Sequence, residues 1–305
     1  MKRKIVACLF SFLFVCVFAS SMSAEEILNN SGAAVATDNS SAPEPLNRYA
    51  RNNDKVNYGM LSELENYIYK ITAWGYYEAT INISYGKAGR FLGYGRSGFG
   101  SCIRIGNEIW TLAHVVTVSK MSFKYPGNNG TLYSLTPQKE LEVHYEIIMN
   151  GDIRVPLKLK WMSKEMDIAI FALPENVTQS ILEFPYKIGD DALLSEGDYV
   201  EIWGHPRATN RVNRRGGMTD KKILFSGDFD IVNAHQLFTA NIVGHPGDSG
   251  SPVVAYSNKT GEPELVGFLH GGIPFDGYST AGLPVFILKI GEYKWWRDGM
   301  LEKVE

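Results

Sequence analysis

The chain has 305 residues, of which 45% are apolar and 12% aromatic, enough to bury a substantial core in one large or two small domains. A formal charge of -3 gives no reason to expect a nucleic-acid partner. We therefore expect a protein that is globular for most of its length.

Residues 1–24 have the pattern of a secretory signal peptide. Lys2, Arg3 and Lys4 precede an apolar run over 5–19, and small residues follow up to Ala24. An uncleaved membrane anchor is the weaker alternative, because the apolar run is shorter than the roughly 20 residues that cross a bilayer. The pattern predicts export, to the periplasm or the exterior, with no stable membrane insertion after cleavage.

Cleavage of this peptide removes Cys8 and Cys16 and leaves Cys102 as the only cysteine. A mature chain with one cysteine has no internal disulfide, so an exported domain of this kind depends on its core. We expect Cys102 to be a small buried residue of a strand, with an intermolecular bridge as the alternative.

Residues 25–72 are rich in Asn, Ser, Ala and Pro and predict a propeptide or linker that is largely disordered. Composition does not separate an inhibitory pro-segment from a passive spacer. Within this stretch, Leu61, Leu64, Ile68 and Ile71 have the three-to-four spacing of one helix face and predict a short helix.

From about residue 73 the chain consists of short β-rich runs separated by Gly, Asn, Asp and Pro, and no long amphipathic helix interrupts them. This pattern predicts an all-β fold, either an antiparallel sandwich or paired barrels. The Pro-, Gly- and Asp-containing stretch over 174–197 is the natural seam, and 289–303 is expected to form a closing helix. Strands are expected at 79–85, 100–105, 109–113, 121–125, 141–149, 155–162, 168–173, 199–203, 222–231, 237–243, 252–256, 265–269 and 285–288.

Three motifs point to nucleophilic catalysis. Ser249 lies between glycines in a tight turn before a β-branched run, His114 ends an apolar strand, and Asp167 directly precedes another. Alone, each has a structural interpretation, as a turn serine, a core histidine or a strand-edge acid. Together, in the order His, Asp, Ser with 53 and 82 residues between them, they favour a catalytic triad.

These motifs resemble those of the trypsin-like (chymotrypsin-fold, PA clan) serine endopeptidases. The resemblance is carried by residues 111–114, 167–170 and 247–252, and covers the chain from about residue 74 onward. It implies a peptidase domain over 73–305 with two six-stranded antiparallel β-barrels, at about 73–185 and 186–288, and the short C-terminal helix.

The resemblance also implies a role for each residue. His114 would act as general base and then acid, Asp167 would orient its imidazole, and Ser249 would form the acyl-enzyme. The backbone amides of Gly247 and Ser249 would form the oxyanion hole. This chemistry requires no metal ion and no organic cofactor.

Some features depart from the digestive members of the family. Without disulfides, the chain looks closer to bacterial members such as the glutamyl endopeptidases and the high-temperature-requirement proteases, without the peptide-binding domain that the latter append. Asp248 has no recognisable N-terminal amine to pair with, so either another processed amine or hydrogen bonds within its own loop are expected.

The expected substrate pocket comprises Val243, His245, Leu269, His270 and Gly271. Val243 argues against a preference for Lys or Arg. Either His270 or His245 would bind an acidic substrate side chain, and the alternative is a histidine bonded to the backbone near the cleft.

The sequence thus predicts an exported, monomeric serine endopeptidase that acts on protein or peptide substrates. The alternative from another class is a catalytically silent relative that serves as a binding or adhesion protein. An esterase that uses the same triad is a third hypothesis.

Overall fold

The computed structural model describes residues 48–51, 64–83, 89–120, 122–126, 132–149, 152–205, 213–220, 236–274, 282–291 and 293. The predicted signal peptide and most of the predicted linker lie outside these residues, so export stays a prediction. Among the helices of the described ranges, none has the length and apolar character needed to cross a bilayer.

The first sheet contains seven antiparallel strands in the order β1-β2-β3-β7-β6-β5-β4. They are β1 (Ile68–Ile83), β2 (Gly89–Ile105), β3 (Glu108–Thr111), β4 (Phe123–Pro126), β5 (Leu132–Ile148), β6 (Arg154–Ser163) and β7 (Ile168–Ala172). Strand β1 also pairs with β5, so six of the strands close into an antiparallel barrel, which confirms the prediction for one barrel.

The second sheet has the order β12-β9-β10-β11-β14-β13-β8, with β12 also pairing with β13. Its strands are β8 (Lys187–Ile188), β9 (Tyr199–Gly204), β10 (Asn213–Asp220), β11 (Leu237–Ala240), β12 (Pro252–Tyr256), β13 (Pro263–Pro274) and β14 (Gly282–Lys289). It departs from a regular six-stranded barrel, because β8 is a seventh strand that runs parallel to β13 and β10 meets β11 over only two residue pairs. In the described residues the second barrel is thus not closed, contrary to the prediction.

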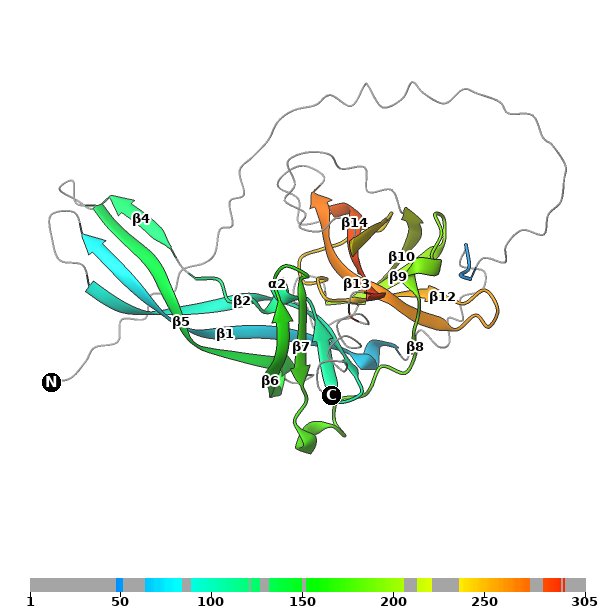
Figure 1. The fold of residues 1–305 in the computed structure, drawn as a ribbon, viewed down its shortest axis with the longest axis horizontal. Coiled ribbons are helices and arrows are strands. Elements are labelled where there is room, and N and C mark those ends of the chain that lie inside the picture. Colours follow the sequence, from blue (N-terminus) through cyan, green and yellow to red (C-terminus); the bar gives the residue numbers. More distant parts are fainter. Residues whose placement is uncertain are drawn as a thin grey trace, which may run out of the picture.

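The two sheets lie side by side with the connection over 173–186 between them (Figure 1). The helical elements whose bounds lie within the described ranges are short, namely α2 (Ala113–Val116) and 3-10 turns at Glu65–Tyr67, Glu175–Val177 and Asp191–Leu193. The all-β class is confirmed. The predicted C-terminal helix over 289–303 falls almost entirely outside the described residues and is not evident in the rest.

Of the helix predicted at 61–71, residues 64–67 are helical, but the prediction is wrong from Ile68 onward, where β1 begins. Leu64, Ile68 and Ile71 are buried, as the spacing predicts. The backbone from Ile68 onward is a strand, since it pairs with β2 on one side and β5 on the other. The barrel therefore starts five residues before the boundary expected at residue 73.

Strands β1, β2 and β5 are much longer than expected and extend beyond the barrel as an arm, at the left of Figure 1. The glycine-rich sequence of β2 has the composition of a loop, which hides this strand from sequence analysis. A Cβ at Gly93 would lie 2.4 Å from the Tyr77 ring, so the absence of a side chain lets β2 lie flat against that buried ring.

Residues 48–51, inside the predicted linker, pack against the second sheet. Tyr49 is fully buried and its hydroxyl donates to Glu264 Oε2 at 3.1 Å, while Arg48 pairs with the other carboxylate oxygen of Glu264 at 2.6 Å. The backbone of Ala50 donates to Tyr256 and accepts from Tyr199. The ordered fold thus reaches into the stretch that was expected to be disordered.

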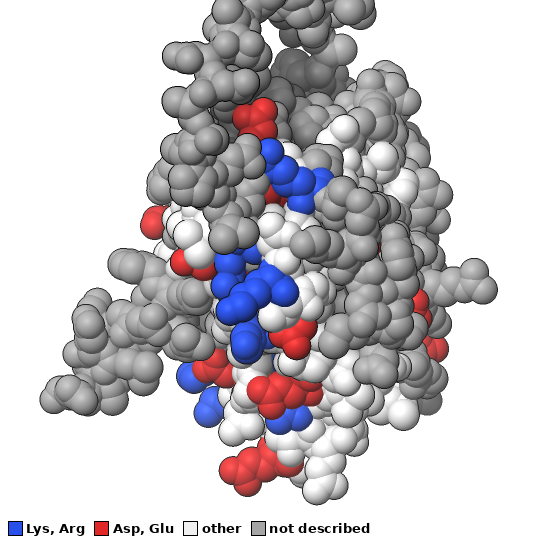
Figure 2. Space-filling view, turned by 90° about the vertical axis from the view of Figure 1, so that its right-hand side faces the viewer, with Lys and Arg blue, Asp and Glu red and all other residues white. Residues whose placement is uncertain are grey.

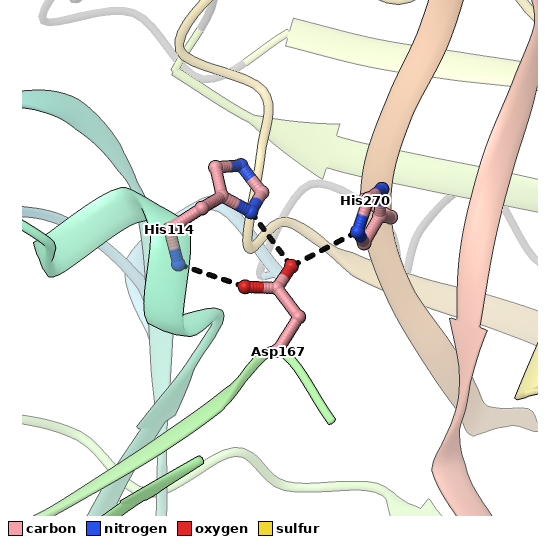
Figure 3. A group of neighbouring side chains, drawn as sticks. All are labelled: His114, Asp167 and His270. Atoms are coloured by element: carbon pink, nitrogen blue, oxygen red, sulfur yellow. Dashed lines mark hydrogen bonds and ion pairs between the residues drawn. The ribbon is translucent and has the colours of Figure 1, made fainter. Parts of the chain in front are cut away.

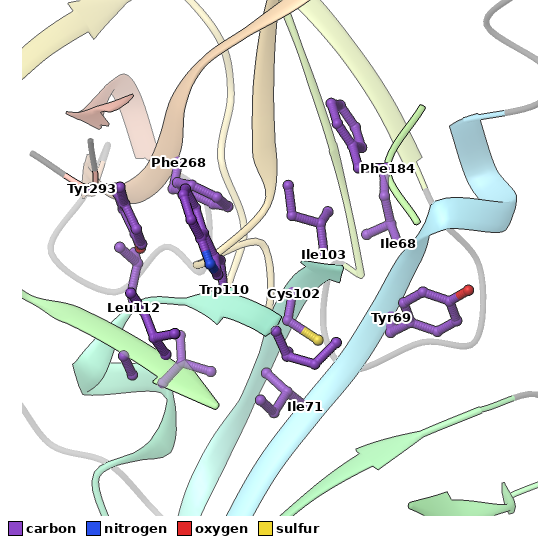
Figure 4. Packing of buried hydrophobic residues seen from close by; sticks show 14 of the residues in the cluster. Ile68, Tyr69, Ile71, Cys102, Ile103, Trp110, Leu112, Phe184, Phe268 and Tyr293 are labelled. Atoms are coloured by element: carbon purple, nitrogen blue, oxygen red, sulfur yellow. The ribbon is translucent and has the colours of Figure 1, made fainter. Parts of the chain in front are cut away.

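A hydrophobic core is formed by buried residues of both sheets (Figure 4). The Trp110 ring of β3 stacks on Tyr293 with 5.1 Å between centroids, and Tyr293 also packs on Phe268 of β13. Cys102 lies in β2, is fully buried and free, and burial raises the pKa of its thiol. The prediction that Cys102 is a buried strand residue is confirmed. The ring contacts of Tyr293 join β3 of the first sheet to β13 of the second.

Figure 2 shows the face at the right-hand side of Figure 1. On the described part of this face, Lys and Arg side chains gather in the middle with Asp and Glu side chains beside them. Charges of both signs therefore lie next to one another there.

Candidate active site

Asp167 is the centre of the site. It precedes β7 with a φ of 53°, in the left-handed region that few residues other than glycine adopt, and such strain concentrates at functional sites. Its Oδ1 accepts from the backbone N–H of His114 at 2.7 Å, and its Oδ2 lies 2.7 Å from His114 Nδ1 (Figure 3). Its main-chain oxygen accepts from Ala113 at 3.2 Å. The strained conformation thus clamps the turn that carries His114.

The pairing with Asp167 assigns the tautomer of His114. An ionised carboxylate only accepts hydrogen bonds, so Nδ1 carries the proton and Nε2 is left as the basic nitrogen. The side chain of His114 is 44% exposed, whereas that of Asp167 is 14% exposed. The base is thus accessible to a substrate, and the carboxylate that orients it is largely shielded.

Burial alone would raise the pKa of Asp167, but hydrogen bonds and charge attraction from His114 and His270 outweigh it and lower the pKa to about 2. A carboxyl whose pKa falls on folding stabilises the fold above its ordinary pKa near 4, and this contribution is lost as the pH falls towards 2. Asp167 therefore stays ionised at all pH values well above 2.

We expect the Asp167→Asn variant to be less stable than the parent by about 2 kcal/mol at pH 5, from the lowered pKa of the carboxyl. The difference should shrink as the pH is lowered from 4 towards 2, because protonation removes the same charge from the parent. Urea unfolding at a series of pH values measures this, with Asp152→Asn, a change at an exposed acid, as the control. A difference independent of pH would show that the charge of Asp167 contributes nothing.

Ser249 lies in the loop between β11 and β12, which local hydrogen bonds hold tightly. Asp248 N–H donates to the His245 carbonyl at 3.0 Å, and Asp248 Oδ2 accepts from His245 N–H at 2.9 Å. The expected bond of Asp248 within its own loop is thus confirmed. The first sheet fixes the loop as well, since Ser101 N–H donates to the Ser249 carbonyl at 2.8 Å.

Two glycines give this loop its shape. Gly247 has a φ of 94° and Gly250 a φ of 80°, and a Cβ at Gly250 would lie 2.2 Å from the Ser101 carbonyl oxygen. Within the described ranges, the backbone amides of Gly247 and Ser249 donate no hydrogen bond. Both amides are thus available to an oxyanion, as their predicted role requires.

The Ser249 hydroxyl donates to the carbonyl oxygen of His270 over a long 3.4 Å. Between the described residues no hydrogen bond joins this hydroxyl to His114. Such bonds are often long or absent without a substrate and tighten in the reacting complex. A change in the direction of the hydroxyl is therefore needed before Nε2 of His114 can take its proton.

A cavity of about 410 Å³ adjoins the site. His114, Asp167, His270 and Gly271 line it, together with residues that sequence analysis did not single out: Lys164, Glu165, Met166, Gln236, Leu237, Gly272, Phe286 and Leu288. Of these, Lys164, Glu165 and Met166 have a sequence signal, since they are the three residues before Asp167. The others come from the second sheet or directly precede its strand β11.

The predicted pocket residues thus divide into two groups. His270 and Gly271 line the cavity, whereas Val243, His245 and Leu269 do not. Leu269 is 2% exposed and packs in the core of the second sheet, and Val243 is 37% exposed. Of this set, the structure therefore brings only His270 and Gly271 to the cavity.

The ligand-type atoms of His114, Asp167 and His270 all lie within 4.8 Å of one another, a spacing that raises the question of a metal ion. Donor atoms around a tetrahedral zinc ion are about 3.3 Å apart, given bonds of about 2.0–2.1 Å. Asp167 Oδ2 lies 2.7 Å from His114 and 3.1 Å from His270. These shorter distances fit direct hydrogen bonds.

No family model matches this chain, and no curated protein matches it. Solved structures of similar fold include a variant of the HtrA-type protease AlgW with a decapeptide, with 13% identity over 81% of this chain and 67% of that chain and a TM-score of 0.50. The Rv3671c protease from M. tuberculosis in its active form has 17% identity over 85% of this chain and 91% of that chain, with a TM-score of 0.47. The chain spans 64% of the AlgW variant seen with a tripeptide. The fold is thus similar to that of the HtrA-type protease AlgW.

Proposed function

We propose that this chain is an exported serine endopeptidase in which His114, Asp167 and Ser249 form the catalytic triad. The observation that carries the proposal is the double clamp of Asp167 on His114, which leaves a basic nitrogen exposed. The rigid loop with Ser249 and two available amides is the second support. We expect peptide or protein substrates from the fold. We also propose that the protein acts as a monomer, because all three proposed catalytic residues come from one chain.

In the proposed reaction, Nε2 of His114 takes the proton of the Ser249 hydroxyl as Oγ bonds to the scissile carbonyl carbon. The negative charge moves to the carbonyl oxygen, where the amides of Gly247 and Ser249 stabilise it. The C–N bond then breaks and His114 gives its proton to the leaving amine. Water, activated by the same nitrogen, hydrolyses the acyl-enzyme and restores the Ser249 hydroxyl.

The hydrogen bond from Ser249 to the His270 carbonyl favours the second candidate, a silent relative that binds rather than cleaves. A hydroxyl that stays on that carbonyl does not reach a base. The two candidates differ in one property, whether Ser249 becomes nucleophilic when an electrophile occupies the site.

A fluorophosphonate probe tests this directly, because an activated serine displaces its fluoride and keeps the phosphonyl group. We expect one adduct per chain on Ser249, absent from Ser249→Ala and retained in Ser180→Ala, a change at an exposed serine remote from the site. Mass spectrometry of the labelled peptide locates the adduct. Without stoichiometric labelling, the silent relative is the better hypothesis. If Ser249 is labelled, a comparison of casein with an ester substrate separates an endopeptidase from an esterase.

A further inference from the structure

His270 approaches the carboxylate of Asp167 from the opposite sheet. Its Nε2 lies 3.1 Å from Asp167 Oδ2, the same oxygen that His114 Nδ1 contacts at 2.7 Å (Figure 3). The two imidazole rings are 5.3 Å apart between centroids and tilted by 59°. His270 belongs to β13 of the second sheet, whereas Asp167 directly precedes β7 and His114 lies in α2, which follows β3.

The carboxylate requires several donors, because an ionised group with a mostly shielded side chain is costly unless it is well bonded. His114 supplies two donors, its backbone N–H and Nδ1–H, and His270 supplies a third. The bond from His270 also favours the ionised form of Asp167. A neutral His270 can donate in this way only as the Nε2–H tautomer.

We propose that His270 is a positioning residue for the proposed peptidase reaction, acting through Asp167. Its side chain holds the carboxylate in place from the second sheet, and its main-chain carbonyl accepts the Ser249 hydroxyl. His270 thus contacts both Asp167 and Ser249, the two residues with which His114 interacts in the proposed reaction. This inference rests on the proposed function.

The same contact speaks against His270 as the residue that selects acidic substrates. A histidine that binds a substrate carboxylate must direct an N–H at the substrate, and the Nε2 of His270 is already directed at Asp167. Lys164 and Glu165 are the other charged groups that line this cavity. A positioning residue affects the rate of the chemical step, whereas a specificity residue affects substrate binding.

The test uses His270→Ala and His270→Gln in the full-length chain. The matched control is His144→Ala, at a histidine of β5 that stacks on Trp74 of β1. We expect His270→Ala to lower kcat by about tenfold to a hundredfold with KM within about twofold, as small misplacements of catalytic groups do. His270→Gln should recover most of the loss, since its amide offers an N–H at similar reach. His144→Ala should leave both constants unchanged.

The pH profile separates positioning from a merely structural role. Loss of one donor leaves more negative charge on Asp167 for the His114 imidazolium, so the acid limb of kcat/KM should move to higher pH in His270→Ala. A raised KM with an altered preference for Glu or Asp at the cleavage site would overturn the proposal in favour of specificity. Unchanged kcat and an unchanged acid limb would also overturn it.

A second measurement does not depend on activity or on a variant that folds. Long-range ¹H–¹⁵N spectra of the histidine-labelled parent report the tautomer of each ring, and His270 is expected as Nε2–H and His114 as Nδ1–H. A His270 that carries its proton on Nδ1 alone contradicts the inference, even in an active enzyme. An inactive protein with both expected tautomers contradicts the proposed function instead, while the contact stands.

Discussion

Replacement of Ser249 by alanine is expected to lower kcat on a peptide substrate by roughly a millionfold, because Ser249 is the group proposed to form the acyl-enzyme. The alanine removes one oxygen from a half-exposed position in a loop that backbone bonds hold, so the fold should be retained. Progress curves at high enzyme concentration measure the residual rate.

The control for this loss is Ser180→Ala, which should keep the parent rate, and urea unfolding should show equal stability for all three proteins. A residual activity within about tenfold of the parent would show that another nucleophile does the work. In that case the fluorophosphonate adduct should also map to a different residue, so the two experiments check each other.

The Asp167→Asn variant is expected to show a kcat lowered by about 10⁴-fold near neutral pH. The amide can donate a hydrogen bond to His114 Nδ1, which would move the imidazole proton to Nε2 and remove the base. The two short contacts that Asp167 makes with His114 show how directly this tautomer depends on an acceptor. Initial rates at saturating substrate measure the effect.

Asp152→Asn, at an exposed acid, is the matched control and should retain full activity. A loss of less than about tenfold in Asp167→Asn would contradict the role of Asp167. The rate at which the fluorophosphonate forms its adduct on Ser249 should be reduced in Asp167→Asn and unchanged in Asp152→Asn.

The members of the proposed triad could be predicted because each lies within a local pattern. His114 and Asp167 border apolar strands, and Ser249 is flanked by glycines, so the type of neighbour identifies each position. Their pairwise contact is then a consequence of the fold, and the structure shows it for His114 and Asp167. The approach of the Ser249 hydroxyl to His114 remains a prediction.

The role of His270 could not be predicted from the sequence. It lies 103 residues after Asp167 (270 minus 167) and on the other sheet, so only the packing of the sheets brings the two together. Neighbouring residues of a strand face opposite sides. Leu269 therefore enters the core while His270 faces the site, and a register shift at this point of β13 is not visible in the sequence.

The lengths of strands β1, β2 and β5 were underestimated for a different reason. The glycines of β2 have low intrinsic strand propensity, yet close packing on Tyr77 requires a glycine at Gly93. Strand length in the arm is set by tertiary contact between β1, β2 and β5, which a local pattern does not report.

The burial of residues 48–51 places a segment that precedes β1 in the sequence on the second sheet. In the described residues, Ala50 bonds to the second sheet, β1 to β7 form the first sheet, and the connection over 173–186 leads back to the second. Two covalent spans therefore link the halves that supply Ser249 and His114. Such double tethering raises the effective concentration of one half for the other, so that separation of the halves costs more than the loss of their contacts alone. For the proposed peptidase, this contact would supply part of the constraint that disulfides give to other proteins.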